Sequence, residues 1–382
     1  MPRGNGLVPN TAARIVRTIW QNPQISRVGI AERLALDKST ITNQVARLID
    51  IGLIEEIDEG SAGTRGGRRP IHLAINRSFG RVIGIEIQVE TYVAVVVDLA
   101  GEVLGETRGS ISSGWEHCSD TMLGVIHECS DKLCPGGERL LGVGVGTAGL
   151  VDSKRGRIRY SVPLGIHSTV DFGATVASNL AVPCLIENDA NCCAWGELAF
   201  NRNEALRDFL FALIEFRRDR LSQGQSGEIG VGFGIVLGGK VYTGTNGNAG
   251  EFRSAFCDGR GESQLSLPKM TLSRLDSDRD VLIAAAEELS RNTAMLVNTM
   301  DFERVYVGGD IEALDVDCPS ILRRRIAENW MYPFPKEVEI RYSSLGGRAV
   351  AYGAAGMILD RLILEQSLPA LGALSLSNAN AV

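Results

Sequence analysis

The sequence predicts an α/β protein in which an amino-terminal winged helix-turn-helix precedes a larger body. Two observations predict the first part. Residues 11–51 contain three apolar patterns with helical spacing, and residues 1–77 carry eleven Lys/Arg against seven Asp/Glu. A third observation predicts the second part, because strand-like apolar runs alternate with helical patterns from residue 81 to residue 364. At 382 residues and 44% hydrophobic, the chain is large enough for two or three domains.

The amino-terminal module follows the order helix, helix, tight turn, helix, hairpin. We expect its helices at residues 11–21, from residue 25 onward, and at 39–51. Asp37 precedes the third helix in the position of an amino-terminal cap. Residues 53–57 and 71–75 are predicted strands, and the loop between them is rich in glycine and arginine. This order is typical of a winged helix-turn-helix, whose third helix enters the major groove of DNA.

Polar and basic side chains are expected on the outward face of the third helix and on the loop, or wing. The amides of Asn43 and Gln44 suit base edges, whereas hydroxyl and ammonium groups suit phosphate. The predicted DNA-contacting residues are Lys38, Ser39, Thr40, Thr42, Asn43, Gln44 and Arg47 on the helix and Arg65, Arg68 and Arg69 on the wing. The alternative is a solvated helix face and a linker. The rest of the chain carries 28 Lys/Arg against 39 Asp/Glu, so only this end suits nucleic acid.

A run of three polar residues lies near the middle of the body. Residues 181–186 predict a buried strand and 190–200 a helix, so Glu187, Asn188 and Asp189 fall at the junction. In open α/β folds, ligands bind in the crevice at the carboxyl ends of strands. Two carboxylates and an amide accept and donate several hydrogen bonds, as neighbouring sugar hydroxyls require. The alternative is a simple helix cap by Asn188 or Asp189. One residue suffices for a cap, so the run favours a ligand.

This run resembles the signature of the ROK family, which groups sugar kinases with sugar-responsive transcriptional repressors. The resemblance extends over nearly the whole chain and implies a two-lobed actin-like, ribonuclease H-like body of the sugar-kinase type. It also implies that Asp189 contacts the sugar, and that Asp189 would be the general base in a kinase. The sugar-binding residues implied by the resemblance are Asn188, Asp189, Glu251, Gly149, Ser254 and Gln264. The amino-terminal module resembles that of the ROK repressors, which the family's kinases lack.

Several family motifs are altered in this chain. Family kinases bind phosphate with an Asp-x-Gly-Gly-Thr-Lys loop, and here Gln88 and Val89 replace both glycines, so we expect no phosphate role. Ser254 replaces a histidine that is often a zinc ligand, and only Cys257 remains of a zinc knuckle, so we expect no metal and no cofactor. The glycine run at 230–234 resembles a second phosphate loop, although glycines of a twisted hairpin explain it equally well.

The expected function is a sugar-responsive, DNA-binding transcriptional regulator of the repressor type, without kinase activity. Its expected partners are double-stranded operator DNA, a small sugar as effector, and further copies of the chain in a homodimer or higher homo-oligomer. One alternative is an ATP-dependent sugar kinase, in which Asp189 would be the catalytic base. The other is a regulator whose sugar site has decayed into a dimerising scaffold.

The expected domains are a DNA-binding domain at 1–77, a first lobe at 78–200, a second lobe at 201–365 and a disordered tail at 366–382. We expect the final helix of the second lobe to return to the first lobe.

The eight cysteines include no Cys-x-x-Cys, and no signal peptide is evident, which predicts reduced thiols in a cytoplasmic protein. No apolar run is long enough to span a bilayer, so we expect no membrane partner.

Overall fold

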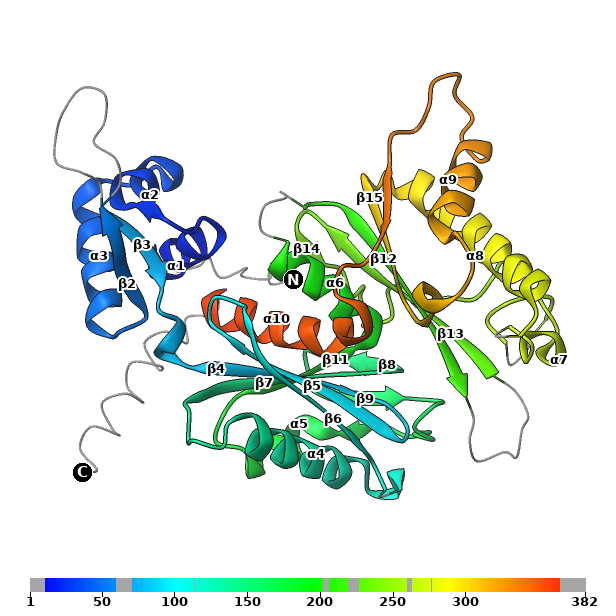
Figure 1. Cartoon of the computed structure of the whole chain (residues 1–382), viewed down its shortest axis with the longest axis horizontal. Helices are drawn as coiled ribbons and strands as arrows, with labels where there is room; N and C mark the ends of the chain where they lie inside the picture. Colours follow the sequence, from blue (N-terminus) through cyan, green and yellow to red (C-terminus); the bar gives the residue numbers. More distant parts are fainter. Residues whose placement is uncertain are drawn as a thin grey trace, which may run out of the picture.

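The computed structural model describes residues 11–59, 71–112, 114–201, 206–218, 227–259, 263–275 and 277–364. Within them, the chain forms a small amino-terminal module and two lobes, each built on a five-stranded sheet (Figure 1). The wing arginines Arg65, Arg68 and Arg69 and the predicted tail at 366–382 lie outside the described residues.

The amino-terminal module has the predicted order of helices and strands. Its elements are α1 (Thr11–Gln21), β1 (Ile25–Ser26), α2 (Arg27–Leu34), α3 (Lys38–Asp50), β2 (Ile54–Glu59) and β3 (Ile71–Ile75). The predicted cap of α3 is confirmed, because Asp37 Oδ1 accepts a hydrogen bond from the amide of Thr40 at 2.8 Å. The expected helix start at residue 25 is wrong, since Ile25 pairs with β3. Ser26 has an extended backbone and caps α2 through its hydroxyl group.

The first lobe is built on a sheet with the strand order β11-β7-β4-β5-β6. Its strands are β4 (Arg81–Ile87), β5 (Thr91–Asp98), β6 (Val103–Ser110), β7 (Leu140–Thr147) and β11 (Cys184–Asn188). The first three are antiparallel, and β7 and β11 run parallel to β4. Helices α4 (Cys118–Leu133) and α5 (Phe172–Asn179) lie below this sheet in Figure 1. A small side sheet contains β8 (Leu150–Asp152), β9 (Arg157–Tyr160) and β10 (Val170–Asp171).

The second lobe repeats this strand pattern, with the order β14-β13-β12-β15-β16. Its strands are β12 (Phe209–Arg218), β13 (Gly227–Leu237), β14 (Lys240–Val241), β15 (Arg304–Gly309) and β16 (Glu339–Tyr342), and its helices are α7 (Lys269–Leu272), α8 (Arg279–Met300) and α9 (Cys318–Glu328). Side chains of β12 alternate between two cores. Leu210 and Ala212 belong to the core under α8 and α9, whereas Phe209 and Phe211 belong to the core beside α6. The repeated pattern gives the two-lobed body that the family resemblance implies.

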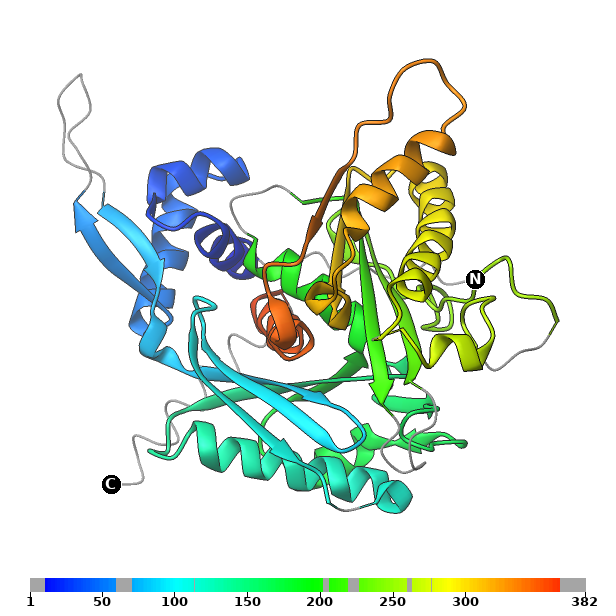
Figure 2. The ribbon, with the colours of Figure 1, turned by 45° about the vertical axis from the view of Figure 1, so that its right-hand side comes forward.

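Two helices, α6 (Asp189–Phe200) and α10 (Ala349–Leu364), fill the space between the sheets. Helix α10 contacts β4, β7 and α6, and α6 contacts β12 and β13. Figure 2 shows α10 nearly end-on above the first sheet. A Cβ atom on Gly84 of β4 would lie 1.9 Å from the carbonyl oxygen of Ala351, and one on Gly353 would lie 1.7 Å from that of Cys192. The backbone of α10 therefore touches the sheet on one side and α6 on the other, which only glycine permits.

The amino-terminal module is joined to the first lobe through a continuous apolar core. Ile15 and Trp20 of α1 belong to the same buried cluster as Val95 of β5 and Ile358 of α10. Trp20 Nε1 also donates a hydrogen bond to the buried carbonyl oxygen of Leu99 at 2.9 Å. The orientation of the module is thus set by packing and by a directed hydrogen bond.

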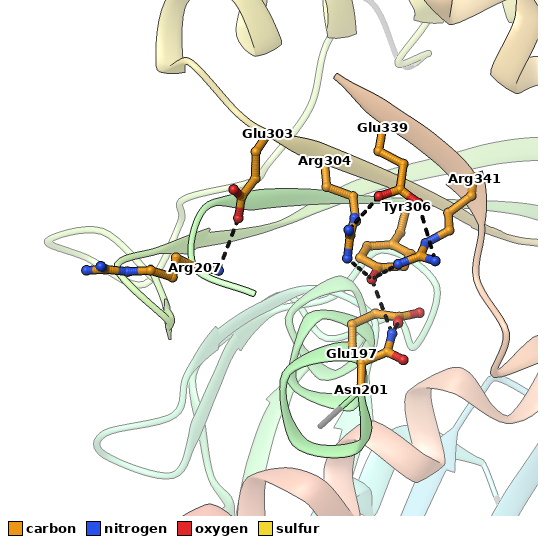
Figure 3. A network of polar contacts seen from close by, with 8 residues as sticks. All are labelled: Glu197, Asn201, Arg207, Glu303, Arg304, Tyr306, Glu339 and Arg341. Carbon is orange, nitrogen blue, oxygen red and sulfur yellow. Dashed lines mark hydrogen bonds and ion pairs between the residues drawn. The ribbon is translucent and has the colours of Figure 1, made fainter. Parts of the chain in front are cut away.

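A polar network joins the carboxyl end of α6 to the second sheet (Figure 3). Asn201 Nδ2 donates to Glu197 Oε2 at 2.6 Å and to Tyr306 Oη at 3.2 Å. The same Tyr306 oxygen accepts from Arg341 at 3.1 Å and from Arg304 at 3.3 Å. Burial raises the pKa of the Glu197 carboxyl. The network fixes α6 to the second lobe at the end opposite the predicted sugar residues.

Replacing Gly353 with Ala should destabilise the protein by at least about 3 kcal/mol, because backbone atoms of α6 and α10 have to separate to admit the methyl group. Urea unfolding followed by circular dichroism would measure the loss. The matched control is Gly124→Ala in α4, where an added Cβ has no neighbour within 4 Å. That change should stabilise the helix by up to about 1 kcal/mol. Equal effects of the two changes would contradict the backbone contact.

Candidate functional site

A cavity of about 230 Å³ lies between the lobes at the amino end of α6. Ligand pockets commonly measure about 300–1,000 Å³, so this one suits a compact ligand. Its polar lining includes the side chains Tyr160, Asn188, Asp189, Glu215, Glu251 and Lys269. Three carboxylates can accept hydrogen bonds from hydroxyl donors but would repel an anion. The lining therefore favours a small polyhydroxyl compound.

Asn188 both caps α6 and faces the cavity. Its Oδ1 accepts hydrogen bonds from the amides of Ala190 at 3.0 Å and Asn191 at 3.3 Å. Its Nδ2 donates to the carbonyl oxygen of Gly149 at 3.1 Å. The capping alternative is therefore observed, yet Asn188 also belongs to the cavity lining. Cap and cavity wall are compatible because the cap fixes the side chain at the cavity edge.

Asp189 and Glu187 lie on either side of this cap, and both are buried. Asp189 Oδ1 accepts a hydrogen bond from the amide of Ala190 at 2.8 Å, at the positive end of the α6 dipole. Glu187 Oε1 accepts from the amide of Asn188 at 2.8 Å and from Asn191 Nδ2 at 3.1 Å. Burial raises the pKa of the Glu187 carboxyl. Asp189 contributes to the cavity lining, whereas Glu187 supports the residues around it.

Gly149 brings backbone to the cavity edge. Its φ angle is +121°, and a Cβ atom there would lie 2.4 Å from the carbonyl oxygen of Tyr160. Only glycine fits this close approach of two chain segments. The resulting turn presents main-chain atoms toward Asn188, as the family resemblance implies.

Two of the predicted sugar-binding residues, Gln264 and Ser254, form hydrogen bonds with other protein groups. Gln264 lines the cavity, but its Nε2 donates to the carbonyl oxygens of Val231 and Phe252, and its Oε1 accepts from the amide of Val231. Ser254 is buried and is absent from the lining; its hydroxyl oxygen accepts from Asn292 Nδ2 at 3.1 Å. Both residues shape the wall formed by the second lobe.

The structure adds three residues that sequence reasoning did not assign to the site: Tyr160, Glu215 and Lys269. Glu215 lies in β12 directly after the apolar run 209–214. A charged residue at the end of such a run could have been recognised in the sequence as a candidate site residue. Lys269 begins the four-residue helix α7, and nothing in its sequence context marks it. Glu251, a predicted sugar contact, lines the cavity, and its backbone pairs with that of Gly232.

Helix α3, which contains seven of the predicted DNA-contacting residues, lies on the side of the module turned away from the body (Figure 1). Lys38, Ser39, Thr42, Asn43 and Arg47 are exposed, and Thr40 and Gln44 are half-buried. The exposed side chains of α3 are accessible to the major groove of DNA.

Asp37 holds two of the hydroxyl groups at the start of α3. Ser39 Oγ donates to Asp37 Oδ1 at 2.5 Å, and Thr40 Oγ1 donates to Asp37 Oδ2 at 2.6 Å. The hydrogen bonds from Ser39 and Thr40 hold the pKa of the Asp37 carboxyl well below its usual range. A phosphate oxygen needs a donor, so these hydroxyls have to leave Asp37 before they can bind phosphate. Lys38 and Arg47 need no such rearrangement.

Comparison with known proteins bears on both parts of the chain. The sequence profile of the ROK family matches residues 82–253, and that of the MarR family matches residues 8–58. A putative xylose repressor from Caldicellulosiruptor sp. strain Rt8B.4 is 30% identical over 62% of this chain and 56% of its own length. The xylose repressor of Bacillus spizizenii is 28% identical over 91% of this chain and 94% of its own length. The chain therefore contains a ROK-type segment at residues 82–253 and a MarR-type segment at residues 8–58.

Solved structures of the family share this fold. A ROK family transcriptional regulator, described as a homologue of the Escherichia coli MLC protein, matches 94% of this chain and 98% of its own, with a TM-score of 0.72 and 20% identity. A ROK glucokinase from Streptomyces griseus, in complex with glucose and AMPPNP, matches 73% of this chain and 99% of its own, with a TM-score of 0.55 and 21% identity. The fold of this kinase is thus matched over nearly its whole length by 73% of the present chain.

The hairpin between β4 and β5, at the place of the kinases' first phosphate loop, is closed by its own hydrogen bonds. The amide of Gln88 donates to the carbonyl oxygen of Thr91 at 2.9 Å, and Gln88 Nε2 donates to Glu86 Oε1 at 2.7 Å. The carbonyl oxygen of Val89 accepts from Trp115 Nε1 at 2.9 Å. The amide of Gln88 is thus committed within the hairpin and does not point at an open phosphate site.

The glycine run at 230–234 lies within β13, which pairs with β12 along its length. A Cβ atom on Gly234 would lie 2.3 Å from the carbonyl oxygen of Ala190 in α6. Close packing between the second sheet and α6 therefore accounts for this glycine, in agreement with the hairpin alternative.

Among the described residues, no group of three or more His, Cys, Asp and Glu could hold a metal ion. In the same part of the chain, no helix is long and apolar enough to cross a membrane.

Glu86 should make stability depend on pH. Burial raises the pKa of its carboxyl from 4.5 to about 7; Gln88 and Arg108 act in the opposite direction, and the charges of Asp189 and Asp310 raise it further. The folded state therefore holds a proton that the unfolded state has lost, and this stabilisation disappears as pH rises from about 4.5 through about 7.

Urea unfolding across this pH range should show wild-type stability falling more steeply than that of Glu86→Gln, which cannot ionise. The stability difference should favour the variant most at the alkaline end. Parallel pH profiles for the two proteins would show that Glu86 titrates normally.

Proposed function

We propose that this chain is a sugar-responsive, DNA-binding transcriptional repressor. The proposal rests on one combination of features: a winged-helix module with an outward-facing α3 is joined to a cleft lined by hydrogen-bond acceptors, while the hairpin at the phosphate position is closed. Two relatives named xylose repressors match 91% of this chain and 94% of their own length. Such a protein reads DNA with one end and a small molecule with the other.

The proposed sugar contacts are Asp189, Asn188, Glu251 and the backbone of Gly149, with Gln264 and Ser254 supporting the wall. The carboxylates of Asp189 and Glu251 come from different lobes, so one ligand that binds both draws the lobes together. Such a ligand shifts the equilibrium only by its differential affinity for the closed and open arrangements. Xylose and N-acetylglucosamine are the first candidates, because they appear in the names of relatives.

The proposed DNA contacts are Asn43 and Gln44 to base edges, with Lys38, Arg47 and the wing arginines Arg65, Arg68 and Arg69 to phosphates. Ser39, Thr40 and Thr42 would join them once their present hydrogen bonds are exchanged. We propose a homodimer, because two such modules would read two half-sites about 34–36 Å apart. A repressor has to reach the chromosome, which places the protein in the cytoplasm.

The route from sugar to DNA follows packed helices. Asp189 begins α6, the backbone of α6 contacts Gly353 of α10, and α10 contacts α1 of the DNA-binding module. A shift of α6 on lobe closure therefore moves α10 and then α1. This is the differential contact between two states that allosteric coupling requires.

Phosphoryl transfer is not part of the proposed function. A kinase has to hold a nucleotide triphosphate in line with its acceptor, chiefly through backbone amides and cations. Here Glu86 and the closed hairpin occupy that place. ATP turnover with a sugar acceptor, abolished by Asp189→Asn, would favour the kinase instead.

An electrophoretic mobility shift with the full chain and the DNA upstream of its own gene tests the proposal. We expect retardation, and we expect one of xylose, N-acetylglucosamine or glucose to change the apparent Kd by about tenfold. Asp189→Asn should still bind DNA but lose the response, because the carboxylate no longer accepts hydrogen bonds from the sugar. Arg47→Ala should weaken DNA binding while leaving sugar binding, measured by calorimetry, unchanged.

Two outcomes would contradict this proposal. Failure to retard any upstream fragment would remove the DNA-binding function. Retardation that no sugar alters, together with silent calorimetry, would favour a dimerising scaffold with a decayed site.

Trp20→Phe tests the coupling route. The change keeps an aromatic ring but leaves the buried carbonyl oxygen of Leu99 without its donor, at a cost of about 1–3 kcal/mol in unfolding free energy. We expect intact sugar affinity and a smaller effect of sugar on DNA affinity. A matched control is Trp330→Phe, whose indole donates to the exposed loop at Phe334. Unchanged coupling in Trp20→Phe would exclude α1 as the link.

A further inference from the structure

A second cavity, of about 280 Å³, lies beside the cleft and has a basic lining. Four cationic side chains line it: Lys154, Arg155, Arg157 and Arg159. Thr243 and Thr245 of the second lobe add hydroxyl groups. This concentration of positive charge stands out on a body that is acidic as a whole, with 28 Lys/Arg against 39 Asp/Glu beyond residue 77.

Ion pairs balance only part of this charge. Arg155 pairs with Asp152 at 2.8 Å, and Arg157 pairs with Asp171 at 2.8 Å. Within the part of the chain that the structure describes, no ion pair involves Lys154 or Arg159. Two positive charges therefore remain, which matches the charge of about −1.5 to −2 on a phosphate group at neutral pH.

Arg159 is also incompletely hydrogen-bonded. Its Nη2 donates to the amide oxygen of Asn248, while its Nε is buried and lacks a hydrogen-bond partner among the described residues. Buried polar groups without partners are uncommon in folded proteins and usually mark a missing ion, water or ligand. A guanidinium group with unused donors is well suited to the paired oxygens of a phosphate.

The cavity spans both lobes. Its cationic side chains come from β9 and the turn before it, Asp152 of β8 also lines it, and Thr243 and Thr245 come from the loop after β14. Ser153 in its wall favours the ionised form of the Glu187 carboxyl, and Glu187 in turn holds Asn188 and Asn191 at the start of α6. A ligand in this cavity would therefore act on the same strand end as the sugar.

We propose that this cavity binds a phosphate group, either free phosphate or the phosphate of a small metabolite, and thereby stabilises the arrangement of the two lobes. Lys154 and Arg159 supply the charge, and Thr243 and Thr245 donate hydrogen bonds from the opposite lobe. Binding itself does not depend on the proposed sugar site. The effect of the anion on sugar affinity does depend on the proposed sugar site. If the anion favours the closed arrangement of the lobes, it strengthens sugar binding, and sugar strengthens anion binding by the same factor.

Isothermal titration of the full chain with inorganic phosphate, at constant ionic strength in chloride, tests the proposal. We expect binding with a Kd near or below about 1 mM. Lys154→Gln and Arg159→Gln should each weaken it about tenfold, because each removes one unbalanced charge. The matched control is Arg291→Gln, an exposed residue of α8 outside this cavity that loses the same charge. Thermal unfolding should show that all three variants remain folded.

A second titration with glucose 6-phosphate distinguishes the two sources of the phosphate. If the sugar of a monoester reaches the cleft, Asp189→Asn should weaken binding of glucose 6-phosphate but not of phosphate. If the site takes free phosphate, Asp189→Asn should leave both unchanged. No measurable heat with either compound, or equal weakening by Arg291→Gln, would overturn the proposal even if the sugar-responsive function holds.

Discussion

The backbone contact between α6 and α10 is the constraint on which the rest of this structure depends. Gly353 and Gly84 let α10 touch α6 and the first sheet without intervening side chains. At that distance neither helix can slide independently, so movement of one is transmitted to the other. Helix α6 begins at Asp189 in the cleft, and α10 ends against α1 of the DNA-binding module. The cleft and the DNA-reading end are therefore parts of one packed unit.

The polar network around Tyr306 complements this contact from the other side. It fixes the carboxyl end of α6 to the second sheet, while the amino end of the same helix forms part of the cavity lining at Asp189. A helix held in this way tilts or shifts as a rigid body. Small displacements at the cleft can then reach α10 without loss to side-chain rearrangement, which requires the discrete packing seen here.

Much of this arrangement could be predicted from the sequence, because helices and strands with strong apolar periodicity leave a clear pattern. The helix at 11–21 and the strand at 71–75 agree with the structure residue by residue. Short elements such as α5 and β16 were not predicted, since their burial depends on partners distant in the chain. The site shows the same limit. Asn188 and Asp189 follow from a local junction, but Lys269 reaches the cavity only through tertiary packing. The structural role of Gln264 depends on Val231, which lies 33 residues earlier.

The distribution of charge explains how a kinase-like body can serve as a sensor. In the cleft, Asp189, Glu215 and Glu251 favour hydroxyl donors, and buried Glu86 makes the former phosphate position hostile to a nucleotide. Four cationic side chains gather instead at the second cavity, in β9 and in the turn before it. An anion there can hold the lobes together without approaching the sugar hydroxyls. Binding energy is thus available to stabilise one arrangement of the two lobes.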